Sequence, residues 1–519
     1  MQADDLATRP LPAILRAAGA PSRLLLVAAG ALTVGAFAPF HAVFLPFITL
    51  ALLFWHWSVA STPRQGFIGG WLFGLGFFLA GVSWIYVSLH TFGAMPMPLA
   101  ALATLLFCAF LALFPALAGY AVARSKCATT VKLLLLAPAS WTLAEWVRSW
   151  IFTGFPWNSI GYTQIPGSPL AGYAAVGGIY SVSLIVAAMA GCTALLATQA
   201  YTVKSLHRTA AIVSLAFAIG GAGLQQIDWT RPTGASTTVS LLQGNVAQDM
   251  KWREDQLRAT LNTYADMITQ SKAELIVLPE TALPLFLHQV PPDYLDAIAQ
   301  HAKKLGGDVL LGVPERTPDG RYYNTAISLG TAPQQFYRKS HLVPFGEFIP
   351  LRPVLAWIVN ILAIPLQDFT RGAYDQQPLN IAGQRVAVNI CYEDVFGEEI
   401  IRQLPQATLL VNVSNVAWFG RSLAPAQHLQ ISQARALETG RYMLRATNTG
   451  MTAVIDPRGN VVKAAPAFTT ATVDYTVSGY QGSTPYMLWG NYGMLLLIAL
   501  MLGGAFWHHR THLPDNKTS

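Results

Sequence analysis

The sequence predicts a membrane protein of eight spanning helices with an α/β domain inserted between the seventh helix and the eighth. Of the 519 residues, 53% are hydrophobic and only 11% are charged. The mean hydropathy of +0.40 is too high for an ordinary soluble enzyme of this size, and one long polar stretch interrupts the apolar sequence. The apolar runs long enough to cross a bilayer lie at 24–38, 42–59, 66–88, 97–123, 131–150, 170–199, 208–225 and 486–506.

These runs divide the chain into seven spans within 1–225, the α/β domain within 226–485, and a final span with a tail within 486–519. The net charge of +7 belongs to loops of the membrane part, because acidic and basic residues nearly balance in the inserted domain. We therefore expect no nucleic-acid partner. The basic residues fall in alternate loops, so the positive-inside rule places both termini in the cytoplasm and the domain outside. These residues are Arg9, Arg16, Arg23, Arg64, Arg124, Lys126, Lys132, Lys204, Arg208, Arg510 and Lys517.

The four cysteines provide no disulfide framework for the outer domain. Cys108, Cys127 and Cys192 lie in or beside predicted spans, which leaves Cys391 without a soluble partner. In an oxidising compartment such a thiol is either free or used in chemistry. The N-terminus has features of a signal peptide, but a retained anchor is favoured because removing that span would break the alternation of basic loops.

The inserted domain predicts an α/β fold with a mixed sheet packed under helices. Strand-like runs alternate in part with amphipathic helical stretches, and about 250 residues are ample for one such core. The strand runs are 237–243, 274–279, 308–313, 323–329, 385–391, 408–413, 442–447 and 451–456. The helical stretches are 253–271, 293–305 and 424–437.

Two apolar segments of this domain, 348–365 and 283–288, are short for a span and contain prolines. Each is interpreted either as an arm that lies in the lipid headgroup layer or as a buried part of the core.

Within the membrane part, Gly66, Gly70 and Gly74 repeat at every fourth residue, which favours close packing of helices. Glu145 and Arg148 lie one turn apart near the end of the fifth span. They form either an internal ion pair or a site for a lipid headgroup.

Three stretches of the domain carry the groups needed for acyl transfer: Leu-Pro-Glu280-Thr, Tyr-Arg-Lys339-Ser-His, and Asn-Ile-Cys391-Tyr-Glu-Asp. A cysteine thiol is mostly protonated at neutral pH, so a nucleophilic cysteine needs a base and a nearby cation. Glu280 is the candidate base and Lys339 the candidate cation. A lysine beside the tetrahedral intermediate would also stabilise its oxyanion, by about 3 kcal/mol for one well-placed donor. No metal site is expected, because His288, His301, His341 and His428 lack ligand spacing.

These stretches resemble, in order, the Glu-Lys-Cys triad of the nitrilase superfamily, and their setting among eight spans resembles its membrane-embedded branch, the apolipoprotein N-acyltransferases. The resemblance covers nearly the whole chain and implies an αββα sandwich, no cofactor, and a triad of Glu280, Lys339 and Cys391. One departure is Val416, where that family commonly has Asp, which puts one pocket hydrogen bond in doubt. The supporting pocket residues implied are Trp252, Asn324, Glu347, Tyr392 and Glu393, with Glu347 either holding Lys339 or assisting the oxyanion.

The resemblance also implies a reaction and a location. A phospholipid would donate a fatty acyl chain to Cys391, and the α-amino group of a diacylated apolipoprotein would accept it, at the outer face of a bacterial cytoplasmic (inner) membrane. One rival interpretation is a membrane-tethered amidase, since the triad alone also suits acyl transfer to water. Another is a transporter with a sensory domain, although ionisable residues are scarce within the predicted spans.

Overall fold

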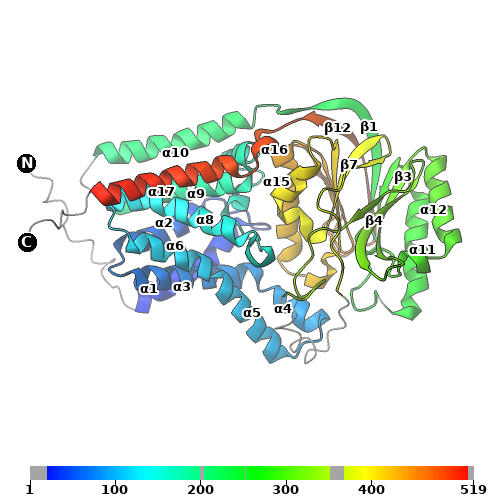
Figure 1. Cartoon of the computed structure of the whole chain (residues 1–519), viewed down its shortest axis with the longest axis horizontal. Helices are drawn as coiled ribbons and strands as arrows, with labels where there is room; N and C mark the ends of the chain where they lie inside the picture. Colours follow the sequence, from blue (N-terminus) through cyan, green and yellow to red (C-terminus); the bar gives the residue numbers. More distant parts are fainter. Residues whose placement is uncertain (1–19, 199–203, 252, 351–367, 512–519) are drawn as a thin grey trace, which may run out of the picture.

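A bundle of helices forms one end of the molecule and a two-sheet domain forms the other (Figure 1). The computed structural model describes residues 20–198, 204–251, 253–350 and 368–511. The predicted arm 348–365 and Trp252 lie largely or wholly outside these residues. The principal helices of the bundle are α1 (Ala20–Thr33), α2 (Leu45–Val59), α3 (Pro63–Val82), α5 (Met97–Leu111), α6 (Leu113–Arg124), α8 (Ala137–Arg148), α9 (Ala174–Thr198), α10 (Lys204–Leu224) and α17 (Tyr492–Thr511).

Helical segments occupy all eight predicted runs, but they differ in length. By length and composition, four segments of the described chain could cross a bilayer, namely Pro63–Val82, Met97–Arg124, Pro169–Ala197 and Tyr492–Arg510. Shorter apolar helices occupy three other runs: Arg23–Ala36, Leu45–Val59 and Arg208–Leu224. The last helix starts later than expected, at Tyr492, because Gly490 adopts a φ of +54° and ends a separate short helix, α16 (Pro485–Trp489).

Glycines allow α3 and α6 to approach each other closely, as the spacing of Gly66, Gly70 and Gly74 predicts. A Cβ atom on Gly66 would collide with the Gly119 carbonyl oxygen, and one on Gly70 would collide with the Pro115 carbonyl oxygen. The backbones therefore meet without side chains between them.

The α/β domain consists of two six-stranded sheets. Each sheet has a parallel centre, β1-β2-β3 in one and β7-β8-β9 in the other, with antiparallel strands at both edges. The first sheet contains, in spatial order, β12 (Ala471–Gly482), β1 (Thr230–Gln243), β2 (Leu275–Val277), β3 (Asp308–Arg316), β4 (Tyr322–Gly330) and β5 (Phe336–Arg338). The second contains β11 (Val461–Ala464), β10 (Ala453–Ile455), β9 (Met443–Thr447), β8 (Leu409–Ser414), β7 (Gln384–Ile390) and β6 (Leu379–Ile381).

The two sheets pack face to face and each is covered by helices on its other face, which gives four layers. Apolar side chains of both sheets share one buried core. A second core lies between the first sheet and the helices α11 (Glu254–Gln270) and α12 (Pro292–Lys304). The second sheet packs on α15 (Ala424–Thr439), whose other face contacts the helical bundle. The αββα sandwich predicted by the resemblance is therefore present.

All eight predicted strands and all three predicted helices of the domain are found within a few residues of the expected bounds, except that β1 begins earlier, at Thr230. Four strands were not predicted: β5, β6, β11 and β12. The segment 283–288 packs on the core between the first sheet and the helices α11 and α12, where Leu283 is fully buried. This packing favours the alternative of a buried segment over that of a membrane arm.

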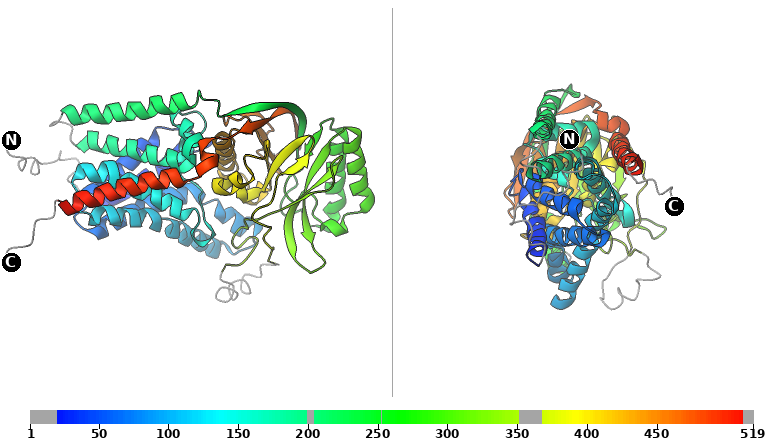
Figure 2. Two further views of the ribbon diagram at one scale, coloured as in Figure 1. Left: turned by 45° about the horizontal axis from the view of Figure 1, so that its top comes forward. Right: turned by 90° about the vertical axis from the view of Figure 1, so that its left-hand side faces the viewer.

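Two features join the domain to the bundle (Figure 2). Strands β1 and β12 pair antiparallel from Thr230–Gly482 to Gln243–Ala471, so the chain leaves α10 and returns to α16 along one ribbon. Helix α15 lies against the bundle and sends polar side chains into it. Gln427 accepts hydrogen bonds from the indole nitrogens of Trp157 (2.8 Å) and Trp84 (3.2 Å). The α/β domain is thus fixed to the bundle by hydrogen bonds as well as by apolar packing.

The contact between α3 and α6 can be tested with Gly70→Ala. The added methyl group has no space beside Pro115, and overpacking of this kind costs about 1–3 kcal/mol. We therefore expect a lower Tm in detergent. Gly504→Ala in α17 is the matched control, because no atom lies within 4 Å of its added Cβ and alanine favours helix formation. Equal Tm values for the two variants would contradict the close contact.

Candidate active site

Cys391 stands at the carboxyl end of β7, where it begins a 3-10 turn, Cys391–Val395. Its φ of +56° is unusual for a residue other than glycine and costs of order 1–3 kcal/mol. Hydrogen bonds hold this conformation: the Ile390 N–H donates to Glu393 Oε2 (2.7 Å), and Asn412 Nδ2 donates to the Cys391 carbonyl oxygen (3.2 Å). The sharp turn lifts the half-buried thiol out of the sheet at the edge where loops meet.

Glu280 follows β2 and is only 7% exposed. Its Oε1 accepts a hydrogen bond from Asn324 Nδ2 (2.7 Å), and its Oε2 accepts one from the backbone N–H of Asn415 (2.8 Å). Asn415 follows β8. Strand ends from both sheets therefore fix the orientation of this carboxylate.

Lys339 follows β5 and is 1% exposed. Its Nζ donates to Glu347 Oε1 (2.9 Å) and lies 3.7 Å from Glu280 Oε1. Burial by itself would lower the pKa of Lys339, but the Glu347 and Glu280 carboxylates outweigh it and raise the pKa above its ordinary value. Lys339 is therefore a permanent cation between two carboxylates.

Asn324 and Glu347 complete this cluster. Asn324 Nδ2 donates to Glu280 (2.7 Å) and also to Glu347 (3.0 Å), so one amide group bridges the two carboxylates. The backbone N–H of Val343 donates to Glu347 Oε2 (2.8 Å). Of the two roles considered for Glu347, its direct contact with Lys339 favours holding the lysine in place.

The surroundings of Cys391 disfavour a resting thiolate. Burial and then the negative charge of Glu280 raise the pKa of the thiol to about 12, against the lowering effects of Lys339 and of the Ser414 hydroxyl. At neutral pH the sulfur therefore carries its proton, and it becomes a strong nucleophile only if a base removes that proton during the attack.

Glu393 and Tyr392 adjoin Cys391 but point in different directions. Glu393 is buried and accepts hydrogen bonds from the Ser340 and His341 backbone N–H groups (2.6 and 3.0 Å) and from the Tyr337 hydroxyl (3.0 Å). Through these hydrogen bonds, Glu393 joins the loop after Lys339 to the turn that begins at Cys391.

Tyr392 faces the helical bundle. Its ring stacks on Trp157, with centroids 6.4 Å apart, and its hydroxyl donates to the Gly154 carbonyl oxygen (3.2 Å).

The structure thus brings Glu280, Asn324, Lys339, Glu347 and Cys391 together. Glu393 and Tyr392 instead link the cysteine turn to neighbouring segments.

Two residues of this site were not singled out from the sequence. The backbone of Asn415 contacts Glu280, a role that no side-chain pattern reveals. Lys251 is 3% exposed, and its Nζ lies 3.4 Å from the Glu280 carbonyl oxygen. The signal that could have identified it is a lysine in the segment after the apolar end of β1, since Glu280 also lies in the segment that follows its strand, β2. Val416, adjacent to Asn415, is buried and its side chain forms no hydrogen bond.

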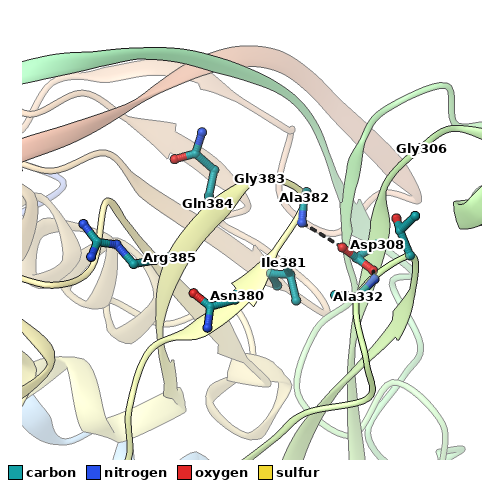
Figure 3. A pocket seen from close by; sticks show the side chains of 10 residues that line it. Gly306, Asp308, Ala332, Asn380, Ile381, Ala382, Gly383, Gln384 and Arg385 are labelled. Atoms are coloured by element: carbon teal, nitrogen blue, oxygen red, sulfur yellow. Dashed lines mark hydrogen bonds between the residues drawn. The ribbon is translucent and has the colours of Figure 1, made fainter.

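A surface cavity of about 330 Å³ lies elsewhere, between the amino ends of β3 and β7 (Figure 3). Asp308 is its acidic residue, but both carboxylate oxygens already accept backbone hydrogen bonds, from Ala332 (2.9 Å) and Ala382 (2.7 Å). Because β7 separates this cavity from Cys391 by about 20 Å of strand, it is not part of the cysteine site.

Comparisons with known proteins identify the family of both parts of the chain. Residues 29–192 match the family model described as apolipoprotein N-acyltransferase N-terminal domain, and residues 238–486 match the carbon-nitrogen hydrolase model. Proteins named apolipoprotein N-acyltransferase are similar over nearly their full length. That of Nitrosomonas europaea is 54% identical, covering 92% of this chain and 95% of the relative. That of Chromobacterium violaceum is 46% identical, covering 95% and 96%. The chain belongs to the apolipoprotein N-acyltransferase family.

Proposed function

We propose that the protein transfers a fatty acyl chain from a phospholipid to Cys391 and then to the α-amino group of a diacylated apolipoprotein. The observation that carries this proposal is the buried cluster of Glu280, Lys339 and Cys391 at the edge of the domain that faces the bundle. The similar proteins are named apolipoprotein N-acyltransferase, which supports the acceptor and the enzyme class. No cofactor takes part in this scheme.

In the first half-reaction Glu280 takes the thiol proton while the Cys391 sulfur attacks the ester carbonyl carbon of the phospholipid. The carbonyl oxygen becomes an oxyanion, which the Lys339 ammonium stabilises. The ester C–O bond then breaks, and Glu280 returns the proton to the leaving alkoxide. A lysophospholipid departs and a thioester remains on Cys391.

In the second half-reaction the neutral α-amino group of the lipoprotein's N-terminal cysteine attacks the thioester carbonyl. Glu280 takes a proton from the attacking nitrogen, the C–S bond breaks, and Glu280 returns the proton to the Cys391 sulfur. The product is an amide, and the enzyme is restored with every proton accounted for.

The placement of the site supports a lipid donor. His341, in the loop after Lys339, lies with its Nε2 2.9 Å from the Thr153 carbonyl oxygen of the bundle. Nearby Trp150 and Phe152 are exposed by 51% and 71%, as is typical of aromatic residues at a membrane surface. The acyl donor would reach Cys391 from the bilayer. The amidase alternative gives no reason for these contacts.

We also propose the membrane arrangement that the sequence predicts. The seven apolar helical regions of 1–225 and the final helix of 486–519 would span the inner membrane of a bacterium, with the domain of 226–485 on the periplasmic side and both termini in the cytoplasm. The alternating basic loops support this orientation.

The acyl-enzyme can be detected directly. After incubation of the purified protein with phospholipid vesicles, we expect intact mass spectrometry to show a gain of one fatty acyl group that hydroxylamine removes. Cys391→Ser lacks the thiol and Glu280→Gln lacks the base, so neither variant should carry this thioester. Asp249→Asn, an exposed carboxylate near the site in sequence, is the matched control and should load normally. Absence of an adduct with every lipid tested would refute the phospholipid-donor step and favour the amidase alternative.

The acceptor can be tested on the loaded enzyme. A peptide that carries diacylglyceryl-cysteine with a free α-amino group should discharge the thioester and gain one acyl chain. The same peptide with an acetylated α-amino group should leave the thioester intact, because it has no nucleophile. Equal discharge by both peptides would indicate hydrolysis rather than acyl transfer.

The bridging amide can be tested with Asn324→Leu, which removes both hydrogen bonds to the carboxylates. A hydrogen bond to a charged group is worth about 1.5–3 kcal/mol, so we expect acyl loading to slow by about 10- to 100-fold. Asn262→Leu on the exposed face of α11 is the control and should load at the normal rate. An unchanged rate for Asn324→Leu would show that the bridge has no part in the reaction.

A further inference from the structure

Lys251 is a buried cation next to Glu280, and it lies in a chain segment different from those that carry Glu280 and Cys391. It follows β1, as Glu280 follows β2 and Cys391 follows β7, so it comes from the same edge of the sandwich. It is 3% exposed, and its charge interacts with those of Glu280 and Cys391. In the described part of the chain, its Nζ has one hydrogen-bond partner, the Glu280 backbone carbonyl oxygen, at a long distance of 3.4 Å. Among the residues that the structure describes, no carboxylate lies within 4 Å of its Nζ.

The two lysines of the site therefore differ. Lys339 is engaged by the Glu347 carboxylate at 2.9 Å and the Glu280 carboxylate at 3.7 Å, so most of its charge is already compensated. A buried ammonium group without a carboxylate partner is costly, and it retains N–H donors for an anion that forms later. Lys251 is in that condition.

The charges around Cys391 indicate that the anion which needs this cation is a thiolate or an oxyanion formed at Cys391. Carboxylates outnumber cations there, so a thiolate or an oxyanion adds to an excess of negative charge. The carboxylates are Glu280, Glu347, Glu393 and Asp394, and the cations are Lys251, Lys339 and Arg445, of which Arg445 lies 3.2 Å from Asp394. His428 is hydrogen-bonded to Asp394 (2.6 Å) and also lies beside the Cys391 backbone.

We propose that Lys251 is the cation that stabilises, through its charge, the anionic states at Cys391, namely the departing thiolate and the tetrahedral oxyanion, in both half-reactions. This inference rests on the proposed function for its place in the reaction cycle. The electrostatic part of the proposal is that Lys251 favours the ionised form of Cys391. This part applies to the resting enzyme without any substrate.

The protonation of Lys251 gives this role a pH dependence. Burial lowers the pKa of Lys251 to about 8, against the raising effects of Glu280 and Cys391. Below pH 8 the lysine is charged and assists ionisation of the thiol, whereas above pH 8 it becomes neutral and that assistance fades. Glu280, Lys339, Glu347 and Arg445 also face the thiol, and none of them is replaced in the test.

The test is the rate at which iodoacetamide alkylates Cys391 between pH 6 and pH 10, without lipid, followed by intact mass spectrometry. Cys108, Cys127 and Cys192 are first replaced by alanine so that one thiol reports. We expect Lys251→Met to react about tenfold more slowly than the parent below pH 8, since one pKa unit changes the thiolate fraction tenfold. The two profiles should converge above pH 8. Lys251→Arg keeps its charge and should stay fast throughout, and exposed Lys304→Met is the matched control.

Identical profiles for Lys251→Met and the parent would overturn the proposal. A uniform slowing at every pH would also overturn it, because a structural defect does not follow the charge of the lysine. If Lys251→Met does not fold, as judged by its Tm, then Lys251→Gln carries the same test, since it retains a donor for the Glu280 carbonyl oxygen. The reaction contains no phospholipid, so a failure of the proposed acyl transfer would leave this result unaffected.

Discussion

The site depends on one buried ammonium group, that of Lys339, held between the carboxylates of Glu280 and Glu347. Without the ammonium group between them, two neighbouring buried carboxylates would repel each other strongly, and without the carboxylates burial would lower the pKa of the lysine. Asn324 and the lysine contact both acids, so the loops after β2 and β5 and the strand β4 must meet at one point. Each of these groups is stable in its charged form only because the others are present.

This arrangement explains why a thiol with a raised pKa can serve as a nucleophile. Lys339 is occupied by its carboxylates and does not hold a resting thiolate, so Glu280 remains a carboxylate ready to accept the proton. The proton then moves during the attack, and the positive charges act on the transition state rather than on the resting enzyme, which is where they accelerate the reaction. The attachment of α15 to the bundle through Gln427 keeps this site next to the helical bundle.

Much of the fold was predictable because hydrophobic periodicity marks buried strands. Three of the four missed strands lacked that signal: β11 (Val461–Ala464) is exposed along its length, and β5 and β6 are three residues each. The segment at Leu283 was ambiguous, since apolar residues suit a protein core as well as a lipid layer, and only its tertiary packing distinguishes them. The number of spans remains a prediction where helices are shorter than a full crossing.

In the site, the sequence order of Glu280, Lys339 and Cys391 indicated which residues should meet. It could not show that Tyr392 faces the bundle, because the positive φ of Cys391 sets the direction of the turn. Lys251 was not predicted because lysines are usually solvated. Its burial depends on the tertiary packing of the segments that follow β1, β2 and β7.

The most direct test of the central claim, that Glu280 acts as a base and does not maintain a thiolate, compares two reactions of Glu280→Gln. Removing the carboxylate removes a negative charge that raises the pKa of Cys391. We therefore predict faster alkylation by iodoacetamide at neutral pH together with loss of acyl loading from vesicles. Slower alkylation in this variant would contradict the account, because it would show that Glu280 keeps the resting sulfur ionised.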